Sequence, residues 1–331
     1  MDIIEKIYDI NENVILNLTN KNLTNIDDEI FESTNLESLG LCSNKIKYMS
    51  PQIKNLTNLI ILHLGFNKLS SLPVEISGLN NLKVLYINNN SFNVFPTEVC
   101  NLINLEELCL QENKIKVIPN EIGNLSNLTD LDFGHNEINY LSPNIKHLTK
   151  LKYFDCKYNY IKNIPAEIGN LSNLKKLSLS INCIECLPDE IGNLTNLTNL
   201  FLYNNKIKIL PNTIGNLINL EKIVVSCNNL KIIPSTINKL RNLKIFRLFN
   251  NDLVFLPFEI LEIKDALFID YSSYNVLNIQ ENVDFLIFYD LNGDLTNLPL
   301  NLKNIWIKDN KDNKDNHIKI KLPFGCTINY Y

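Results

Sequence analysis

Residues 105–127 read LEELCLQENKIKVIPNEIGNLSN, and this stretch is one copy of a unit that recurs every 23 residues along the chain. Apolar residues fall at positions 1, 4, 6, 11, 14, 18 and 21 of the unit, Asn at position 9 and Pro at position 15. The Leu at position 1 recurs at Leu36, Leu59, Leu82, Leu105, Leu128, Leu151, Leu174, Leu197, Leu220 and Leu243. A fixed period of this length predicts a repeat array, in which each unit buries its apolar face against its neighbours.

Positions 3 to 7 of the unit predict a short β-strand, because inward and outward positions alternate along it. Positions 4 and 6 are then expected to face the core, and positions 3, 5 and 7 to face outward. All units run in the same direction, so the strands should pair in parallel, joined by crossovers of a dozen or more residues. Pro at position 15 ends the extended segment, and EIGNL predicts a short helical turn.

The sheet is expected to line a concave surface. Strands need only about 4.8 Å of spacing, whereas helical turns are about 10 Å wide. Turns stacked outside strands therefore force the array to curve, with the sheet on the inside.

The unit resembles the leucine-rich repeat family, LxxLxLxxNxL, in its intracellular 23-residue form that ends LPxEIGxLxNL. The resemblance covers about residues 13–310, and ten consecutive units match without a gap. It implies an α/β fold: a right-handed, horseshoe-shaped solenoid with a parallel sheet on the concave face and short helices and turns on the convex face. Members of this intracellular group often act around small GTPases, which is an analogy at the level of the fold.

The Asn at position 9 predicts a structural ladder where the chain leaves each strand. An amide side chain carries donors and an acceptor, so each Asn is expected to satisfy backbone groups of its own turn and of the next one. We call this set the asparagine ladder: Asn44, Asn67, Asn90, Asn113, Asn136, Asn159, Asn182, Asn205, Asn228 and Asn251.

The ends of the chain depart from the repeat, although no linker between domains is visible and one continuous domain is expected. Residues 1–12 place Ile3, Ile4, Ile7 and Tyr8 on one helical face and predict a helical cap. Eleven regular repeats are expected over 13–265, the first with Lys21 in place of the ladder Asn. Residues 266–310 predict irregular, shorter repeats, and residues 311–331 a cap or closing strand.

Composition excludes some classes of protein. The formal net charge of −5 argues against nucleic-acid binding, which draws its affinity from many Lys and Arg contacts to phosphate. No signal peptide or membrane span is apparent, so we expect a cytoplasmic protein without a membrane partner. The scattered cysteines are expected to be free thiols. Asn makes up about one residue in six, which resembles proteins of amoebae and of the giant DNA viruses that infect them.

Two groups of outward-facing residues are candidate protein-binding sites. Exposed aromatic residues and Arg are typical of binding hot spots, and stacked like charges weaken a sheet, so stability alone does not explain them. Drift on a solvated surface is the alternative explanation. The acidic cluster comprises Glu107, Asp130, Asp132, Tyr153, Asp155 and Tyr158. The aromatic cluster comprises Phe201, Tyr203, Arg247 and Phe249.

Other chemistry finds weaker support in the sequence. Asp132 and Asp155 should lie about 5 Å apart on adjacent strands, as the carboxylates of a retaining glycosidase do, but an open sheet offers no pocket. The four acids are too few oxygens for an ordinary hard-cation cage. Cys183 and Cys186 form a CxxC, but a zinc site needs a second pair of ligands. Cys109 and His135 lie one strand and three positions apart, which makes a nucleophile–base contact unexpected. His63, His147 and His317 have no partner at a useful spacing.

The sequence therefore predicts a non-catalytic interaction scaffold, without cofactor or metal, that binds a protein on its concave face. The partner is unknown; a basic protein or a small GTPase are the two kinds considered. One alternative is the substrate-recruiting part of an effector-type enzyme complex, for example in ubiquitin ligation or small-GTPase regulation. Only about 20 residues follow the last repeat, so we expect no fused catalytic domain. A purely structural component is the third possibility.

Overall fold

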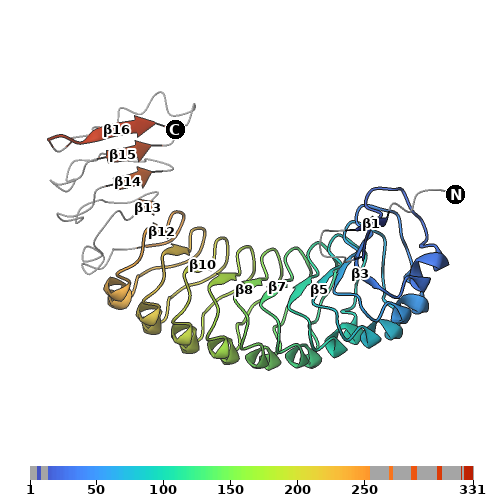
Figure 1. Cartoon of the computed structure of the whole chain (residues 1–331). Helices are drawn as coiled ribbons and strands as arrows, with labels where there is room; N and C mark the ends of the chain where they lie inside the picture. The colour runs from blue at the N-terminus through green and yellow to red at the C-terminus, as the bar shows by residue number, and fades with distance from the viewer. Residues whose placement is uncertain are drawn as a thin grey trace. The chain divides into compact units, whose positions relative to one another are not determined.

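A computed structural model describes residues 6–8, 14–253, 268–270, 285–288, 304–307, 322 and 324–330. Its contacts divide the chain into two compact units, residues 1–174 and 175–331, which are described one at a time (Figure 1). The prediction of one continuous domain stays a prediction.

The first unit is a run of strands with short 3-10 helices between them. Strands β2 to β8 pair in parallel, each with the next. The strands are β1 (Lys6–Tyr8), β2 (Val14–Asn17), β3 (Leu36–Gly40), β4 (Ile61–His63), β5 (Val84–Tyr86), β6 (Glu107–Cys109), β7 (Asp130–Asp132) and β8 (Tyr153–Asp155). The helices are η1 (Asp28–Glu32), η2 (Pro51–Asn55), η3 (Val74–Gly78), η4 (Thr97–Asn101), η5 (Asn120–Asn124), η6 (Pro143–His147) and η7 (Ala166–Asn170).

The second unit repeats this arrangement, again with parallel pairing between successive strands. Its strands are β9 (Lys176–Ser178), β10 (Asn199–Phe201), β11 (Lys222–Val224), β12 (Ile245–Arg247), β13 (Phe268–Asp270), β14 (Phe285–Phe288), β15 (Asn304–Ile307) and β16 (Thr327–Tyr330). Its described helices are η8 (Asp189–Asn193), η9 (Asn212–Asn216) and η10 (Ser235–Lys239).

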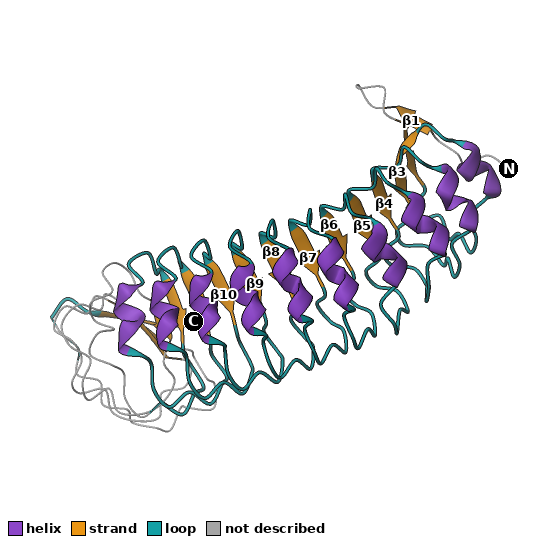
Figure 2. Cartoon of the chain, turned by 90° about the horizontal axis from the view of Figure 1, so that it is seen from below, coloured by secondary structure: helices purple, strands orange, loops and turns teal. Residues whose placement is uncertain are grey.

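The core lies between the strands and the 3-10 helices, which cover the side away from the exposed face of the sheet (Figure 2). The predicted inward positions form it. In the unit that begins at Leu105, each of them is at most 2% exposed: Leu105, Leu108, Leu110, Ile115, Ile118, Ile122 and Leu125. The predicted helical turn is confirmed as a 3-10 turn, in which the N–H of Leu125 donates to the carbonyl of Ile122 at 3.1 Å.

Most strands span only positions 3 to 5 of the repeat, two residues fewer than predicted. Pairing nevertheless continues, since Leu110 donates to the carbonyl of Asp132 at 2.8 Å and Glu112 to that of Gly134 at 3.0 Å. The regular strand stops because position 8 takes a left-handed backbone, with φ of 56° at Glu112 and 55° at Tyr158. This conformation is unfavourable for L-residues with bulky side chains, so the neighbouring hydrogen bonds must hold it.

The predicted N-terminal helix is wrong where the structure describes it. Lys6–Tyr8 form β1, which pairs antiparallel with β2. A helical cap would bury apolar side chains but leave the backbone groups of the first strand's edge without partners. An added strand satisfies those groups directly, and the hydrophobic pattern of a segment this short does not distinguish the two.

The C-terminal repeats are described only at their strands. Ile269 on β13 pairs with Leu286 on β14, 17 positions later, and Phe285 pairs with Asn304, 19 positions later. The tail contains β16, which pairs in parallel with β15 and begins near the end of the alternating segment in which a strand is predicted. Ala266 and Tyr274, which depart from the repeat consensus, lie outside the described residues.

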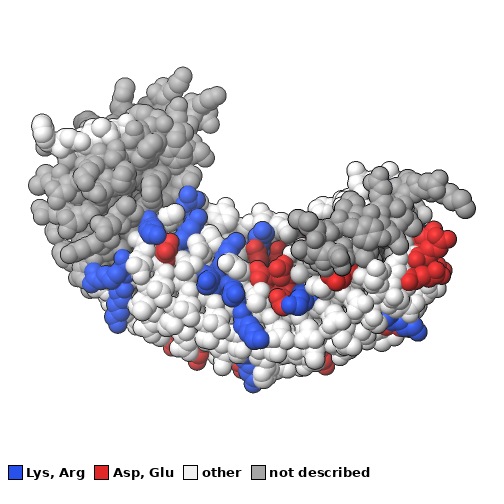
Figure 3. Space-filling model, in the orientation of Figure 1, with Lys and Arg blue, Asp and Glu red and all other residues white. Residues whose placement is uncertain are grey.

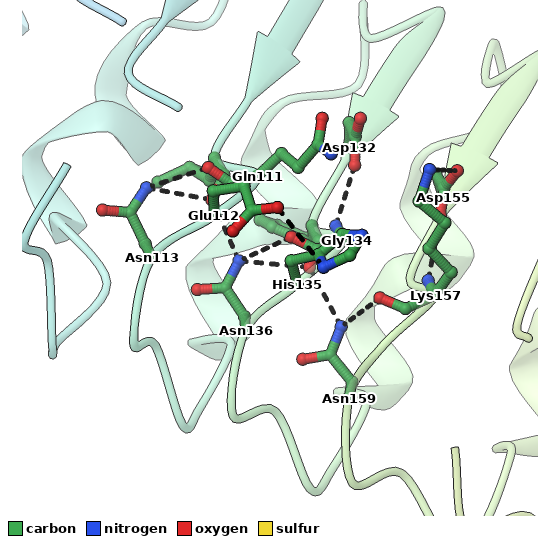
Figure 4. A network of polar contacts seen from close by, with 12 residues as sticks. Gln111, Glu112, Asn113, Asp132, Gly134, His135, Asn136, Asp155, Lys157 and Asn159 are labelled. Atoms are coloured by element: carbon green, nitrogen blue, oxygen red, sulfur yellow. Dashed lines mark hydrogen bonds and ion pairs between the residues drawn. The ribbon is translucent and has the colours of Figure 1, made fainter. Parts of the chain in front are cut away.

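The asparagine ladder links each turn to the preceding repeat, and not to the following one as the sequence suggests. The side-chain amide of Asn136 donates to the carbonyl of Phe133 at 3.1 Å in its own turn and to that of Leu110 at 2.9 Å in the preceding repeat. Its Oδ1 accepts the N–H of Ile115 at 3.0 Å. Each ladder Asn follows a residue with a left-handed backbone, such as His135 with a φ of 55° before Asn136, and residue types alone do not indicate this feature. Figure 4 shows the bonds that the side-chain amides of Asn113, Asn136 and Asn159 donate within their own turns.

A second series of asparagines lies at position 23, just before the leading Leu. Asn127 donates to the carbonyl of Ile103 at 2.9 Å and Asn104 to that of Asn80 at 2.8 Å, 24 residues earlier in each case. These bonds are exposed, unlike those of the ladder. Lys150 occupies one of these positions and donates to Oδ1 of Asn127 at 2.7 Å. The recurring NL pair was the sequence signal for this series.

Candidate protein-binding surface

The strand register places the acidic cluster in two columns on the exposed face of the first unit. Glu107 pairs with Asp130 and Asp130 with Tyr153, which forms the column of position 3. Asp132 pairs with Asp155 in the column of position 5. Figure 3 shows acidic side chains gathered beside strand β7. Carboxylates on adjacent strands lie close enough to repel one another.

The two carboxylates of the position-5 column also have a structural role. Oδ1 of Asp132 accepts the N–H of Gly134 at 2.8 Å, and Oδ1 of Asp155 accepts that of Lys157 at 2.9 Å (Figure 4). Nζ of Lys157 lies 3.6 Å from Oδ2 of Asp155. Burial raises the pKa of the Asp132 carboxyl, and the charge of Asp155 adds to this, whereas the Gly134 N–H and Lys157 oppose it. Folding therefore disfavours the ionised form of Asp132 relative to its protonated form.

Tyr158 adds an exposed aromatic ring to the residues of the acidic cluster. Its ring stacks on that of His135, with centroids 4.1 Å apart and planes at 15°. Nδ1 of His135 lies 3.3 Å from Oε1 of Glu112 (Figure 4). Tyr153 and Tyr158 are 45% and 46% exposed. The cluster thus combines charge with rings that a partner can cover.

His63, which has no catalytic partner at a useful spacing in the sequence, contacts an aromatic ring in the structure. Its ring stacks on Tyr86 with centroids 4.7 Å apart, and the Tyr86 hydroxyl donates to Oε2 of Glu107. Burial lowers the pKa of His63, while Glu107 opposes the shift. His63 and Tyr86 are partners in the column of position 5, whereas Glu107 lies in the column of position 3 on the next strand. The 23-residue spacing of His63 and Tyr86 accounts for their stacking, whereas the contact of Tyr86 with Glu107 crosses from one column to another and does not follow from that spacing.

The thiols and acids do not form a recognisable catalytic or metal site within the described residues. Burial raises the pKa of Cys109 to about 12, and the charge of Asp132 adds to this, so the thiol is protonated at neutral pH. Cys109 lies opposite Asp132 in the register, and not opposite His135. Both cysteines of the CxxC, Cys183 and Cys186, are free. In the described part of the chain, no group of three or more His, Cys, Asp and Glu is arranged to hold a metal ion.

The aromatic cluster lies on the exposed sheet face of the second unit. The rings of Tyr203 and Phe249 have centroids 6.2 Å apart at 45°. Arg247 is exposed on β12, in the same column as Phe201. Two lysines of this face, which are not among the residues predicted for the aromatic cluster, lie close to its Phe201 ring. Nζ of Lys176 and Nζ of Lys222 lie 5.7 and 5.2 Å from the centroid of the Phe201 ring. The sequence signal for this contact was the presence of Lys at position 3 in two repeats on either side of the repeat that contains Phe201.

No helix among the described residues is long and apolar enough to cross a membrane. A search of curated proteins finds no match. Several solved structures are similar. A leucine-rich repeat protein of Leptospira interrogans is 31% identical, with a TM-score of 0.75; the match covers 95% of this chain and 83% of that one. A TDR receptor is 27% identical over 89% of this chain and 56% of its own, with a TM-score of 0.74. The functional domain of InlJ from Listeria monocytogenes is 22% identical over 89% and 68%, with a TM-score of 0.71.

The family model described as a leucine-rich repeat region matches residues 31–140, 96–202 and 133–254. Together these regions span well over half of the chain and the whole series of ladder asparagines from Asn44 to Asn251. The repeat, the parallel strands backed by 3-10 turns and the ladder agree with this match. The chain therefore belongs to the leucine-rich repeat family and folds as a leucine-rich repeat solenoid.

Proposed function

We propose that this chain is a non-catalytic protein-binding module, and that the acidic cluster of the first unit engages a basic segment of its partner. The leucine-rich repeat fold supports a role as an interaction module in general. The choice of surface rests on the acidic cluster, where four carboxylates share two columns and only Asp155 forms a salt bridge among the described residues.

A cationic partner relieves a strain that the free protein carries. Repulsion between each pair of neighbouring carboxylates weakens the sheet by a few tenths of a kcal/mol, on the order of 0.2–1. Lys or Arg of a partner removes that repulsion and increases the rate of encounter. The exposed rings of Tyr153 and Tyr158 add apolar area that association covers. The surface thus offers both electrostatic attraction of a cationic partner and apolar area for contact with it.

The test is capture by immobilised full-length chain from an extract of the source organism, followed by titration of the captured protein after purification. The surface variant carries Asp130→Asn, Asp132→Asn and Asp155→Asn. The matched control carries Glu98→Gln, Glu121→Gln and Glu167→Gln, which remove the same charge from η4, η5 and η7 on the helical side.

We expect the surface variant to bind at least about tenfold more weakly at low salt, which corresponds to about 1.4 kcal/mol, with a smaller loss at high salt. The control should bind like the wild type. Equal binding by all three proteins contradicts the proposal.

A further inference from the structure

Two lysines of the second unit converge on one aromatic ring. Lys176 and Lys222 flank Asn199 in the column of position 3, and both ammonium groups approach Phe201, on the same strand as Asn199. The face of an aromatic ring attracts cations, which explains how one ring holds both. The two charges still repel one another. Within the described residues, neither lysine forms a salt bridge, although Lys208 and Lys244 of the same unit do. The pair therefore lacks an anion.

A buried hydroxyl in the neighbouring column also lacks a partner. Ser226 lies at position 7, between Tyr203 and Phe249 in the repeat, and is 0% exposed. Adjacent strands are about 4.8 Å apart, so residues two strands apart are separated by about 10 Å at the backbone. The rings of Tyr203 and Phe249 nevertheless approach to 6.2 Å and so lean toward each other across Ser226. Oγ of Ser226 is a buried side-chain atom with no hydrogen-bond partner among the described residues.

We infer that Phe201, Lys176 and Lys222 form a binding site for an acidic peptide segment, which the Ser226 hydroxyl joins only when the rings of Tyr203 and Phe249 move apart. Ammonium groups only donate hydrogen bonds, and the unpartnered hydroxyl has a donor available, so the set favours an anion. The three rings of the aromatic cluster favour an apolar or aromatic side chain next to that anion. The inference rests on the proposed function in one respect, which is that the sheet face binds proteins.

A peptide fits this surface better than a nucleic acid does. Single-stranded nucleic acids need a groove of cations that follows successive phosphates, as well as stacking rings. Here two lysines converge on a single point, which matches one or two carboxylates and not a chain of phosphates. The chain's net charge of −5 also opposes a polyanion more than a short acidic segment.

The experiment measures fluorescence anisotropy of the labelled peptide EEDYEED with the full-length chain at low and high salt. The matched basic peptide KKRYKKR and a 12-nucleotide oligo-dT are measured in parallel. Lys176→Gln with Lys222→Gln should weaken binding of the acidic peptide at least tenfold at low salt, and Phe201→Ala by a similar factor. The control Lys208→Gln with Lys231→Gln removes the same charge from exposed positions outside the sheet face and should change affinity less than twofold. Ser226→Ala should weaken binding severalfold without lowering the melting temperature.

The possible outcomes separate this inference from the proposed function. The inference is overturned if the wild type does not bind the acidic peptide, if the control loses as much affinity as the lysine pair, or if oligo-dT binds more tightly. If the basic peptide is still bound through the acidic cluster in those cases, the proposed function stands. If only the acidic peptide is bound, through Lys176 and Lys222, the inference holds and the assignment to the acidic cluster fails.

Discussion

The asparagine ladder and the exposed sheet face belong to the same repeats, yet they follow opposite rules. The ladder keeps one residue type at one position from Asn44 to Asn251, because that side chain serves backbone groups of two successive repeats. The sheet face changes at almost every repeat, from Asp132 and Asp155 in the first unit to Phe201 and Val224 in the second. Backbone geometry constrains the former, whereas the latter can vary at a smaller cost to the fold and can therefore carry specificity.

The largest expected effect is on the ladder side of this comparison. Asn136→Ala removes one acceptor and two donors, and leaves the carbonyls of Leu110 and Phe133 and the N–H of Ile115 without that partner. We expect a loss of about 1–3 kcal/mol in the free energy of unfolding. Glu121→Ala, at an exposed position of η5, should change it by less than about 0.5 kcal/mol. Urea melts measure both, and equal losses would contradict the structural role of the ladder.

The second asparagine series sharpens the comparison, because it offers the same side chain in an exposed setting. Asn127→Ala removes the bonds to the carbonyl of Ile103 and to Nζ of Lys150. Water can replace both partners, so we expect a loss of about 0.5–1 kcal/mol, smaller than at Asn136. The same urea melts test this. A loss at Asn127 as large as that at Asn136 would mean that burial does not determine the contribution of these amides.

A smaller effect, of opposite sign, is expected on the sheet face. Because the folded-state pKa of Asp132 is raised above its ordinary value of 3.8, the folded protein holds this proton to higher pH than the unfolded chain does. Stability is therefore lost as the pH rises from the ordinary pKa through the raised one. Asp132→Asn keeps an oxygen for the Gly134 N–H and has no such titration.

Asp132→Asn should consequently raise the melting temperature slightly at pH 7, and the difference from the wild type should shrink as the pH falls below 3.8. Thermal melts over this range provide the measurement, with Glu167→Gln on the helical side as the control. A variant that is less stable at pH 7 would show that the charge of Asp132 stabilises the free protein.

The smallest expected effect concerns the thiols, which should differ only in their rates of alkylation. Cys156 is 0% exposed and should resist alkylation until the protein unfolds. Cys186 is exposed and should react first, while Cys109 should react slowly because burial raises its pKa to about 12. Mass spectrometry after timed labelling measures the order. An oxidised Cys183–Cys186 pair in protein isolated with thiol trapping would return the CxxC to consideration as a redox motif.

Much of the fold follows from the sequence because the 23-residue period constrains strands, turns and core together. The apolar positions of residues 105–127 are all buried as predicted, and EIGN forms a helical turn. The period says nothing about segments that occur once, such as Lys6–Tyr8, which form a strand and not a helix. It also does not indicate backbone conformation, so the left-handed position 8 and the direction of the ladder bonds emerge only in the structure.

The candidate site was predictable column by column but not across columns. The register of Glu107, Asp130 and Tyr153 follows from the period. The contacts between Tyr86 and Glu107, and those of Lys176 and Lys222 with Phe201, depend on which way long side chains lean. Repeat positions do not determine these directions, because several rotamers are open to an exposed side chain.

The most direct test of the separation between ladder and sheet face is one paired measurement of stability and affinity in the first unit. The wild type, Asn67→Ala and the variant with Asp130→Asn, Asp132→Asn and Asp155→Asn are each melted and then titrated with the peptide KKRYKKR well below their melting temperatures. We predict that Asn67→Ala loses stability and keeps its affinity within about twofold, whereas the sheet-face variant keeps its stability and binds at least about tenfold more weakly. Parallel losses of stability and affinity in both variants would contradict the account.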